Sequence, residues 1–270
     1  MRRRTFVAAG LAFAATPAWA VSSTGKEGRL TLKGTMEQGS LVLGYAEPQA
    51  AVLVDGKPVR LTAEGVFAFG FAFDQAKPTL LSVTWGDGTV ETQSCLPVVR
   101  QYEIQRVNGL PQNTVTPPPE VLARIRAEAE AVYLARQRDT EGVDFLSGFD
   151  WPAPGIESGV FGSQRIDNGV PMTPHFGVDM AAPTGTPIRA PADGVVSLSA
   201  DHYLNGGLPA YLHQSRRLVT EGDVVKRGQK IGEIGQTGRA TGPHLHWAMN
   251  WFEMRLDPSR STRTPKPDPL

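Results

Sequence analysis

Histidine is the residue type that first suggests chemistry in this sequence, because it is scarce and unevenly placed. The 270 residues contain five histidines, and none of them precedes position 175. They are His175, His202, His213, His244 and His246. A residue type used without regard to function would fall in both halves of the chain about equally. The clustering therefore indicates a site in the C-terminal part of the chain.

Two short motifs suggest which of these side chains act together. In Pro174-His175-Phe176-Gly177-Val178-Asp179 the histidine and the aspartate are four residues apart, so they share a face on either a helix or a strand. The proline, the glycine and the β-branched valine favour extended chain. In TGPHLHW, residues 241–247, a strand would turn His244 and His246 to one side and Leu245 to the other. Each motif thus predicts two ligand-type side chains that point the same way.

Two histidines and a carboxylate are the ligand count of a catalytic zinc site. Such sites use three protein ligands and leave the fourth position for water. The sole cysteine, Cys95, lies far from the histidines in the sequence, and the lack of thiolates argues against a closed structural site. Cys95 is expected to be a small buried apolar side chain. A lone His-x-His pair is weak evidence, but its combination with His175 and Asp179 is much stronger.

The N-terminal half reads as short strands that must fold into a separate module. From Arg29 to about Cys95, apolar and polar residues alternate with a period of two. Asp55-Gly56 and Asp87-Gly88 lie between such runs, where tight hairpin turns need positive backbone dihedrals. This pattern predicts a β-sandwich of immunoglobulin-like type within an accessory domain at residues 21–100.

The composition changes twice more along the chain. Residues 101–145 are expected to be a linker, in which Pro117-Pro118-Pro119 precedes a helix from Glu120 to about Arg138. Residues 146–260 are rich in glycine and proline, with short strands, and predict an antiparallel-β domain that contains all five histidines. Residues 261–270 form a polar tail. The expected fold is mainly β.

The N-terminus and the overall charge indicate where the protein acts. Residues 1–20 combine arginines, a short apolar run and Ala18-Trp19-Ala20, which is typical of a cleaved signal peptide. Arg3-Arg4 also fits a twin-arginine export signal. We expect a periplasmic or secreted protein with no stable membrane insertion after signal removal. With 27 basic and 27 acidic residues, no nucleic-acid partner is expected; a monomer is the expected state.

The C-terminal motifs resemble a known family. His175-x-x-x-Asp179, APTGTPIRAPADGVV, Tyr211-Leu212-His213 and GDVVKRGQKIGEIGQTGRATGPHLHW occur in the order found in the lysostaphin-type zinc endopeptidases of bacterial cell walls. The resemblance covers roughly residues 150–258 and implies a C-terminal zinc peptidase domain of lysostaphin type. It implies that His175, Asp179 and His246 bind Zn²⁺, that His213 and His244 flank the activated water, and that the substrate is peptidoglycan. His202 is not part of the motif and is expected to be a loop residue.

One segment departs from the family pattern. Between Ala200 and His213 the chain reads DHYLNGGLPAYLH, about a dozen residues shorter than is usual. The chain could bridge the gap and keep His213 in place, the domain could be a weakened or inactive relative, or a deletion could spoil folding. An alternative function is therefore a catalytically impaired relative that binds cell wall or activates other wall hydrolases.

A second alternative and two smaller questions stay open. GDVVKRGQKIGEIG also fits lipoyl- or biotinyl-type carrier domains and transporter adaptors, but Lys226 and Lys230 lack the tight hairpin setting that a modified lysine needs. That reading would leave the histidine cluster unexplained.

Trp247, Trp251 and Phe252 could stack on substrate, although packing against the sheet is expected. Arg239 could bind a substrate carboxylate or be a solvated loop residue.

Overall fold

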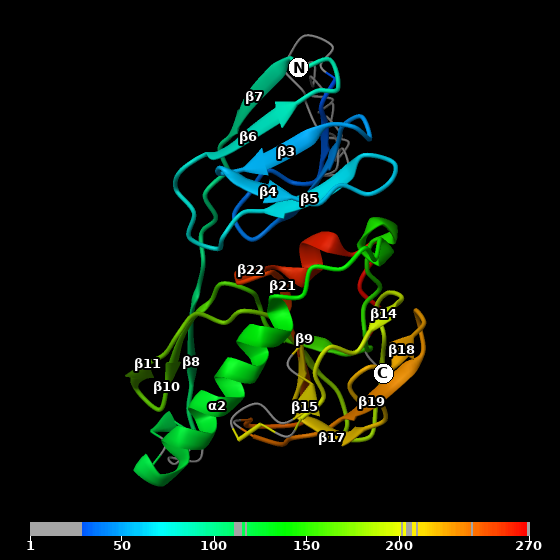
Figure 1. Cartoon of the computed structure of the whole chain (residues 1–270). Coiled ribbons are helices and arrows are strands. Elements are labelled where there is room, and N and C mark those ends of the chain that lie inside the picture. Colours follow the sequence, from blue (N-terminus) through cyan, green and yellow to red (C-terminus); the bar gives the residue numbers. More distant parts are fainter. Residues whose placement is uncertain are drawn as a thin grey trace, which may run out of the picture.

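The computed structural model describes residues 29–110, 115–116, 118–200, 202–203, 207–208, 210–238 and 240–268. The predicted signal peptide, the twin-arginine motif and Arg239 lie outside these residues. Within them the protein is mainly β, with the α-helix α2 crossing beside the C-terminal strands (Figure 1). No helix in this part of the chain is long and apolar enough to cross a membrane.

The N-terminal strands form two sheets that pack face to face, which we call the sandwich (residues 31–95). One sheet has the order β1-β2-β5 and the other β4-β3-β6-β7. The strands are β1 (Thr31–Lys33), β2 (Leu41–Tyr45), β3 (Ala51–Val54), β4 (Lys57–Val59), β5 (Val66–Gly70), β6 (Thr79–Thr84) and β7 (Val90–Cys95). Every second residue of β3 and β6 is buried, as the alternation predicts. The immunoglobulin-like subtype of the sandwich stays a prediction.

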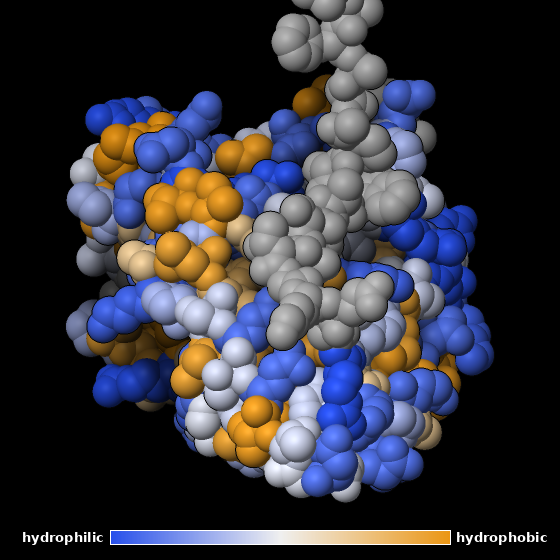
Figure 2. Space-filling model, turned by 90° about the horizontal axis from the view of Figure 1, so that it is seen from above, coloured by the Kyte–Doolittle hydropathy of each residue, from blue (hydrophilic) through white to orange (hydrophobic). Residues whose placement is uncertain are grey.

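The core of the sandwich is aromatic. Phe67, Phe69 and Phe71 are fully buried, and the Phe69 and Phe71 rings meet edge to face with centroids 5.6 Å apart. The turn at Asp55-Gly56 joins β3 to β4 with positive φ at both residues, as predicted for a tight hairpin. Seen from above, hydrophobic residues on the described surface are interspersed with hydrophilic ones (Figure 2).

The helix α2 (Pro119–Arg136) begins with a proline at its first turn, where a missing N–H removes no helical hydrogen bond. Its observed bounds differ from the predicted Glu120 to Arg138 by one or two residues at each end. No residue of α2 is buried. Its half-buried positions include Val121, Ile125, Val132 and Ala135, which recur at helical spacing, so one mostly apolar face of α2 lies against the rest of the protein without entering a core. A short 3-10 helix, η1 (Asp144–Ser147), follows it.

The C-terminal strands position the histidines. A five-stranded sheet has the order β15-β16-β20-β12-β9, and a second sheet has the order β13-β19-β17. Their strands are β9 (Ile156–Gly159), β12 (Val178–Ala181), β13 (Pro187–Arg189), β15 (Gly207–Leu208), β16 (Tyr211–Leu212), β17 (Gln214–Arg217), β19 (Lys230–Ile234) and β20 (His244–Trp247). Met180, Ile188, Ile234 and Leu245 are fully buried between the sheets. Leu245 thus points into the core, as the His-x-His alternation requires.

Smaller elements complete this region. They are β10 (Gln164–Asp167), β11 (Val170–Pro171), β14 (Gly194–Val195), β18 (Val224–Val225), β21 (Met249–Trp251), β22 (Met254–Leu256) and the 3-10 helix η2 (Pro258–Ser261). The predicted polar tail folds back on the domain: the Trp151 indole N–H donates to the carbonyl of Thr264 at 3.2 Å.

The segment expected to be a linker contributes a strand to the C-terminal region. β8 (Ile104–Val107) pairs in parallel with β10, with Ile104 opposite Gln164 and Val107 opposite Asp167. The segment therefore does more than connect two units, and the C-terminal sheet system begins before residue 146.

A buried ion pair joins the sandwich to the C-terminal region. Asp257 is 2 % exposed, and its carboxylate lies 2.8 Å from the Arg100 guanidinium. The Asp257 backbone N–H donates to the carbonyl of Gly39 at 2.7 Å. Next to it, the fully buried Leu256 approaches Gly70 so closely that a Cβ on Gly70 would lie 2.7 Å from a Leu256 methyl group. The two units therefore share an interface that is packed as well as charged.

Candidate metal centre and peptidase site

The structure brings His175, Asp179 and His246 together in a buried cluster. β12 and β20 run antiparallel with Asp179 directly opposite His246, so their side chains emerge side by side from neighbouring strands. His175 approaches from the segment before β12. Its Nε2 lies 2.9 Å from Asp179 Oδ1 and 2.8 Å from His246 Nδ1, and the latter is 2.8 Å from Asp179 Oδ1.

The contacts within this cluster fit a bound cation, because the two imidazoles carry too few protons to make every short contact a hydrogen bond. His175 Nδ1 lies 3.0 Å from the carbonyl of Val160, to which its N–H donates, so Nε2 carries a lone pair. His246 Nδ1 could donate to either His175 Nε2 or Asp179 Oδ1, but not to both with one proton. Three lone-pair atoms that face one point from three side chains form the donor set of a three-ligand zinc site. The residues present therefore fit the metal that the sequence predicted.

Asp179 is held as a carboxylate. It is buried, and burial opposes its charge, yet the contacts of its Oδ1 with the imidazoles of His175 and His246 hold its pKa well below the usual range. Arg165 of β10 contacts the second carboxylate oxygen, Oδ2. The Arg165 guanidinium thus fixes the orientation of the carboxylate and leaves Oδ1 toward the two imidazoles, as outer-shell partners of metal ligands commonly do.

Two glycines make room for the cluster. A Cβ on Gly159 would lie 2.4 Å from Asp179 Oδ2, and a Cβ on Gly177 would lie 2.5 Å from His246 Nε2. Both distances are far below van der Waals contact, and both side chains are buried, so neither can move aside at little cost. Gly159 and Gly177 are therefore required by the space that the candidate ligands occupy.

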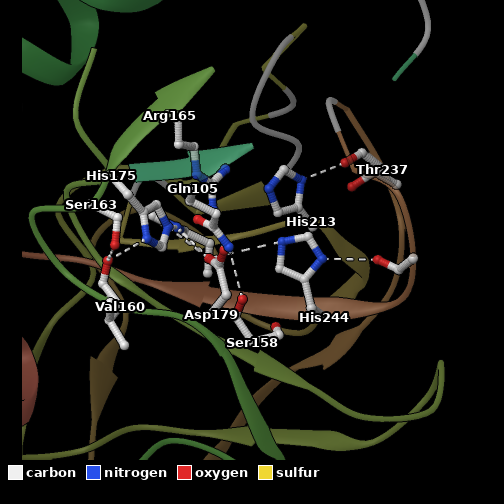
Figure 3. Close-up of polar contacts among 12 residues, drawn as sticks. Gln105, Ser158, Val160, Ser163, Arg165, His175, Asp179, His213, Thr237 and His244 are labelled. Carbon is white, nitrogen blue, oxygen red and sulfur yellow. Dashed lines mark hydrogen bonds and ion pairs between the residues drawn. The ribbon is translucent and has the colours of Figure 1, made fainter. Parts of the chain in front are cut away.

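His213 and His244 form a second pair beside the first (Figure 3). Their ring centroids are 4.5 Å apart. His213 Nδ1 lies 2.6 Å from the carbonyl of Thr237, and His244 Nδ1 lies 2.9 Å from the carbonyl of Gly242. Because each Nδ1–H donates to a carbonyl, each Nε2 is free to accept or deliver a proton. His244 Nε2 is 3.9 Å from Asp179 Oδ1, so this pair borders the metal cluster.

Burial keeps two of these imidazoles neutral. It lowers the pKa of His213 to about 3, with His244 as the next cause, and it lowers the pKa of His246 to about 4. A neutral His246 can use its Nδ1 lone pair for a metal, and a neutral His213 can accept a proton at Nε2. The electrostatics thus leave a lone pair on Nδ1 of His246, as a ligand role requires, and leave Nε2 of His213 unprotonated.

A groove of about 310 Å³ is lined by histidines of both pairs, although His244 is not among its lining residues. Its floor includes His175, His213 and His246, and one wall is α2, through Ile125, Glu128 and Val132 among others. His202, expected to be a loop residue, is buried and also lines this groove.

The segment that departs from the family pattern still delivers His213 to the site. β15 and β16 pair as a short hairpin, and β16 pairs in turn with β20, with Leu212 opposite His246. His213 follows β16 with φ +62°, a left-handed conformation that turns its ring toward His244. The position of His213 next to His244 agrees with the first of the three explanations considered from the sequence.

The aromatic and cysteine residues take structural positions. Trp247 is 2 % exposed and packs edge to face on Trp151, with ring centroids 5.6 Å apart. Trp251 packs against the core of the sandwich, while Phe252 is partly exposed beside it. Cys95 is buried in the sandwich core, which raises the pKa of its thiol to about 11.

Arg165 is the contact that sequence reasoning missed. It lies in β10, in the sequence QRID, where nothing distinguishes a site arginine from a solvated one. The contact depends on β10 being placed close to β12, and no local pattern shows this. A polar residue flanked by Ile166 in a strand next to the histidine segment is the only signal, and it is weak.

Comparison with known proteins places this geometry in a family. The sequence profile described as Peptidase family M23 matches residues 173–258, which include all three candidate ligands and the His213–His244 pair. Residues 173–258 form a Peptidase family M23 domain.

Two curated relatives each match 83 residues of this chain. The peptidoglycan DD-endopeptidase ShyC of Vibrio cholerae is 49 % identical over 83 residues, which are 27 % of this chain and 19 % of ShyC. The DD-carboxypeptidase/endopeptidase Mpg of Neisseria meningitidis is 43 % identical over 83 residues, again 27 % of this chain and 19 % of the relative. The matched part thus spans about a fifth of the length of these relatives.

One solved structure resembles the chain beyond the M23 domain. A Pseudomonas aeruginosa protein assigned to peptidase M23 superposes with a TM-score of 0.63 at 27 % identity, over 84 % of this chain and 94 % of that one. The likeness of fold therefore extends beyond residues 173–258.

Proposed function

We propose that this protein is an exported zinc-dependent endopeptidase that hydrolyses peptide bonds in the stems or cross-links of peptidoglycan. The observation that carries the proposal is the meeting of three buried ligand atoms, on His175, Asp179 and His246, with the neutral His213 imidazole beside them. Relatives named as peptidoglycan DD-endopeptidases support the substrate class, because they share the M23 domain.

Zinc is the metal that suits the donor set. Imidazole and carboxylate are both accepted zinc ligands, and three of them leave a position open toward the groove. When bound, zinc would supply a Lewis acid that polarises the scissile carbonyl and lowers the pKa of a water molecule. The Arg165 contact to Asp179, and the Val160 carbonyl that holds His175, would keep these ligands in place.

The two flanking histidines would do the proton work. His213 is neutral with Nε2 unprotonated, so it can take the proton of the attacking water as a general base. His244, fixed by its bond to the Gly242 carbonyl, can donate from Nε2 once protonated and stabilise the negative charge that develops on the carbonyl oxygen. One histidine is thus assigned to each proton step.

The location and partners follow from the substrate. Peptidoglycan lies outside the cytoplasmic membrane, so a periplasmic or secreted enzyme agrees with the signal peptide predicted at residues 1–20. An open groove suits a polymeric substrate, and the balanced charge of 27 basic and 27 acidic residues agrees with the expectation of no nucleic-acid partner. The monomeric state stays a prediction. The alternative of an impaired relative that only binds or activates is not favoured, because His213 remains next to His244.

The first test is the zinc content of the purified full chain beside a His246→Ala variant. We expect about one zinc per chain in the unsubstituted protein and a loss of it in the variant, because two ligands hold zinc far less tightly than three. A His202→Ala variant, which changes a groove histidine outside the proposed ligand set, should keep its zinc. A folded protein that binds no zinc would overturn the proposal.

The second test is hydrolysis of purified peptidoglycan, with the released peptides identified by mass spectrometry. We expect cleavage by the zinc-loaded protein and a decrease of roughly 10²- to 10⁴-fold in a His213→Asn variant that still holds zinc. Zinc binding without any cleavage of cell wall would leave a metal-binding protein and reject the endopeptidase.

A further inference from the structure

The groove beside the histidines is lined by two arginines whose positive charges are only partly neutralised by neighbouring acids. Arg136 of α2 and Arg255 of β22 both line the groove that contains His175, His213 and His246. They come from elements far apart in the sequence, so their meeting is a product of the fold. They also lie outside the five residues of the metal and proton machinery.

The positive charge of Arg136 disfavours the charge of Arg255. Burial lowers the pKa of Arg255 to about 10, and the positive charge of Arg136 is the next cause. Burial likewise lowers the pKa of Arg136. Two like charges that face one partly buried groove raise the free energy of the protein alone, and a bound anion would relieve this repulsion.

The described neighbours only partly compensate these charges. Glu253 lies 3.7 Å from the Arg136 guanidinium, but its side chain is 47 % exposed and its other carboxylate oxygen accepts from Gln137 at 2.9 Å. Arg255 donates to the neutral amide oxygen of Asn250 at 3.1 Å. One solvent-screened carboxylate therefore serves two guanidiniums.

Glu128, which lines the groove, already has other partners. Glu128 pairs with Arg124 at 2.7 Å, and its carboxylate accepts the backbone N–H of Tyr203 at 2.9 Å. It therefore holds α2 to the segment that contains His202 and does not serve the arginine pair.

Arg255 is also held in place for recognition. Its guanidinium lies 5.6 Å from the centroid of the Phe176 ring, next in sequence to His175, and Phe176 packs edge to face on Phe73 with centroids 5.0 Å apart. A guanidinium stacked on a fixed aromatic ring loses little freedom when it binds a planar anion. A carboxylate is the planar anion that accepts two parallel N–H bonds from such a group.

We propose that Arg136 and Arg255 form a carboxylate subsite that selects peptides with a free carboxylate near the bond to be cut. The inference rests on the proposed function and adds a substrate feature to it. Stem peptides of peptidoglycan offer two sources of such a group, the C-terminal carboxylate and the free carboxylate of a diamino acid residue. The arginine pair recognises the chemistry that both share.

The test measures binding, so that it does not depend on hydrolysis. Isothermal titration calorimetry on the zinc-loaded full chain compares three forms of an uncross-linked stem tetrapeptide: unmodified, amidated at the C-terminus, and amidated at the diamino acid. We expect amidation of the recognised carboxylate to weaken binding on the order of tenfold, the size of a charge-assisted hydrogen bond. The form that loses affinity identifies the source.

Variants locate the effect. In Arg255→Gln and Arg136→Gln the difference between free and amidated peptides should shrink, and in the double variant it should vanish. Glu253→Gln removes the competing acid and should increase the difference. Arg216→Gln, at an exposed position on β17, should leave it unchanged.

The outcomes separate the two proposals. Equal binding of all three peptides by the unsubstituted protein would overturn the subsite whether or not the protein cleaves cell wall. A preference for the free carboxylate that survives in the double variant would also overturn it, because another cation would then be responsible. A preference that is lost in the variants, in a protein that hydrolyses nothing, would support the subsite and reject the endopeptidase.

Discussion

The candidate ligands Asp179 and His246 fit only beside residues without a side chain, so zinc binding should be sensitive to substitution of the neighbouring glycines. Gly159→Ala or Gly177→Ala places a methyl group within about 2.5 Å of Asp179 Oδ2 or His246 Nε2. We expect each change to displace a ligand atom and weaken zinc affinity by roughly 10- to 100-fold, as changes next to metal ligands commonly do. Competition with a chromogenic chelator measures this affinity.

Gly194→Ala is the matched control for the glycine variants. A Cβ at that position meets nothing within 4 Å, so zinc affinity should not change. If Gly159→Ala binds zinc as tightly as Gly194→Ala does, the cluster is looser than the structure indicates.

His213 should make the stability of the protein depend on pH. Its pKa is lowered from 6.5 to about 3 in the folded chain. Between these values the unfolded chain binds a proton that the folded chain does not, so the contribution is complete above about pH 6.5 and decreases as the pH falls toward 3. In urea unfolding at pH 7 and pH 4.5, we expect the unsubstituted protein to lose roughly 1–3 kcal/mol more than His213→Asn.

Asparagine is the appropriate replacement for His213 because it tolerates a positive φ, here +62°. The remaining histidines are common to both proteins, so the difference between the two pH dependences belongs to position 213. Equal losses in both proteins would mean that His213 is protonated or exposed in the folded chain.

Among the elements, α2 depends least on the core. None of its 18 residues is buried, and most helical stability in proteins comes from tertiary packing. Its contacts include exposed or half-buried polar ones, such as those of Glu128 to Tyr203 and Arg136 to Glu253. We expect the amides of α2 to exchange with deuterium well before those of β20, whose Leu245 and Trp247 are buried.

Hydrogen–deuterium exchange with mass spectrometry tests this expectation, with peptides from β12 as a second protected reference. Protection of α2 equal to that of β20 would show that the wall of the groove unfolds only with the whole domain.

The elements that local chemistry specifies were predictable from the sequence. Alternation in β3 and β6, the Asp55-Gly56 turn and the Pro-rich start of α2 all depend on neighbouring residues, and the structure has them close to the expected positions. β8 was missed because it is four residues long and gains its stability from a parallel partner, β10, distant in sequence.

The residues of the candidate site likewise divide into those that local sequence predicts and those that only the fold brings together. The spacing of one short motif predicts that His175 and Asp179 point the same way, whereas their meeting with His246 was implied by the family resemblance. The nearness of His213 to His244 depends on the β15–β16 hairpin, and Arg255 meets Arg136 only through the packing of β22 near α2. Distances of this kind are set by the whole fold and leave no trace in the local sequence.

For the molecule as a whole, the Arg100–Asp257 pair should be an important link. Asp257 is 3 % exposed and Arg100 17 % exposed at their side chains. Arg100→Ala removes the nearest cation from a buried carboxylate, but the N–H and the hydroxyl of Ser259 still donate to Asp257 Oδ1, so the cost should lie toward the lower end of the range of about 3–5 kcal/mol for a broken buried pair. We expect a decrease of about that size in the free energy of unfolding, measured by chemical denaturation of the full chain.

Arg60→Ala provides the comparison. Arg60 pairs with Asp139 at 3.1 Å, but both side chains are about half exposed, so its loss should change stability by less than about 1 kcal/mol. If the two variants are equally stable, the interface between the sandwich and the C-terminal region contributes little to the folded state.

The pairing of β8 with β10 has a practical consequence for anyone who wishes to produce a minimal catalytic fragment. A fragment that starts at residue 146 keeps every candidate ligand but removes the strand beside Arg165, the residue that steadies Asp179. The bare edge of β10 would then invite pairing with other copies of the fragment. We therefore expect the shortest stable fragment that holds the candidate site to begin upstream of Ile104, about forty residues before the boundary that the motifs suggest.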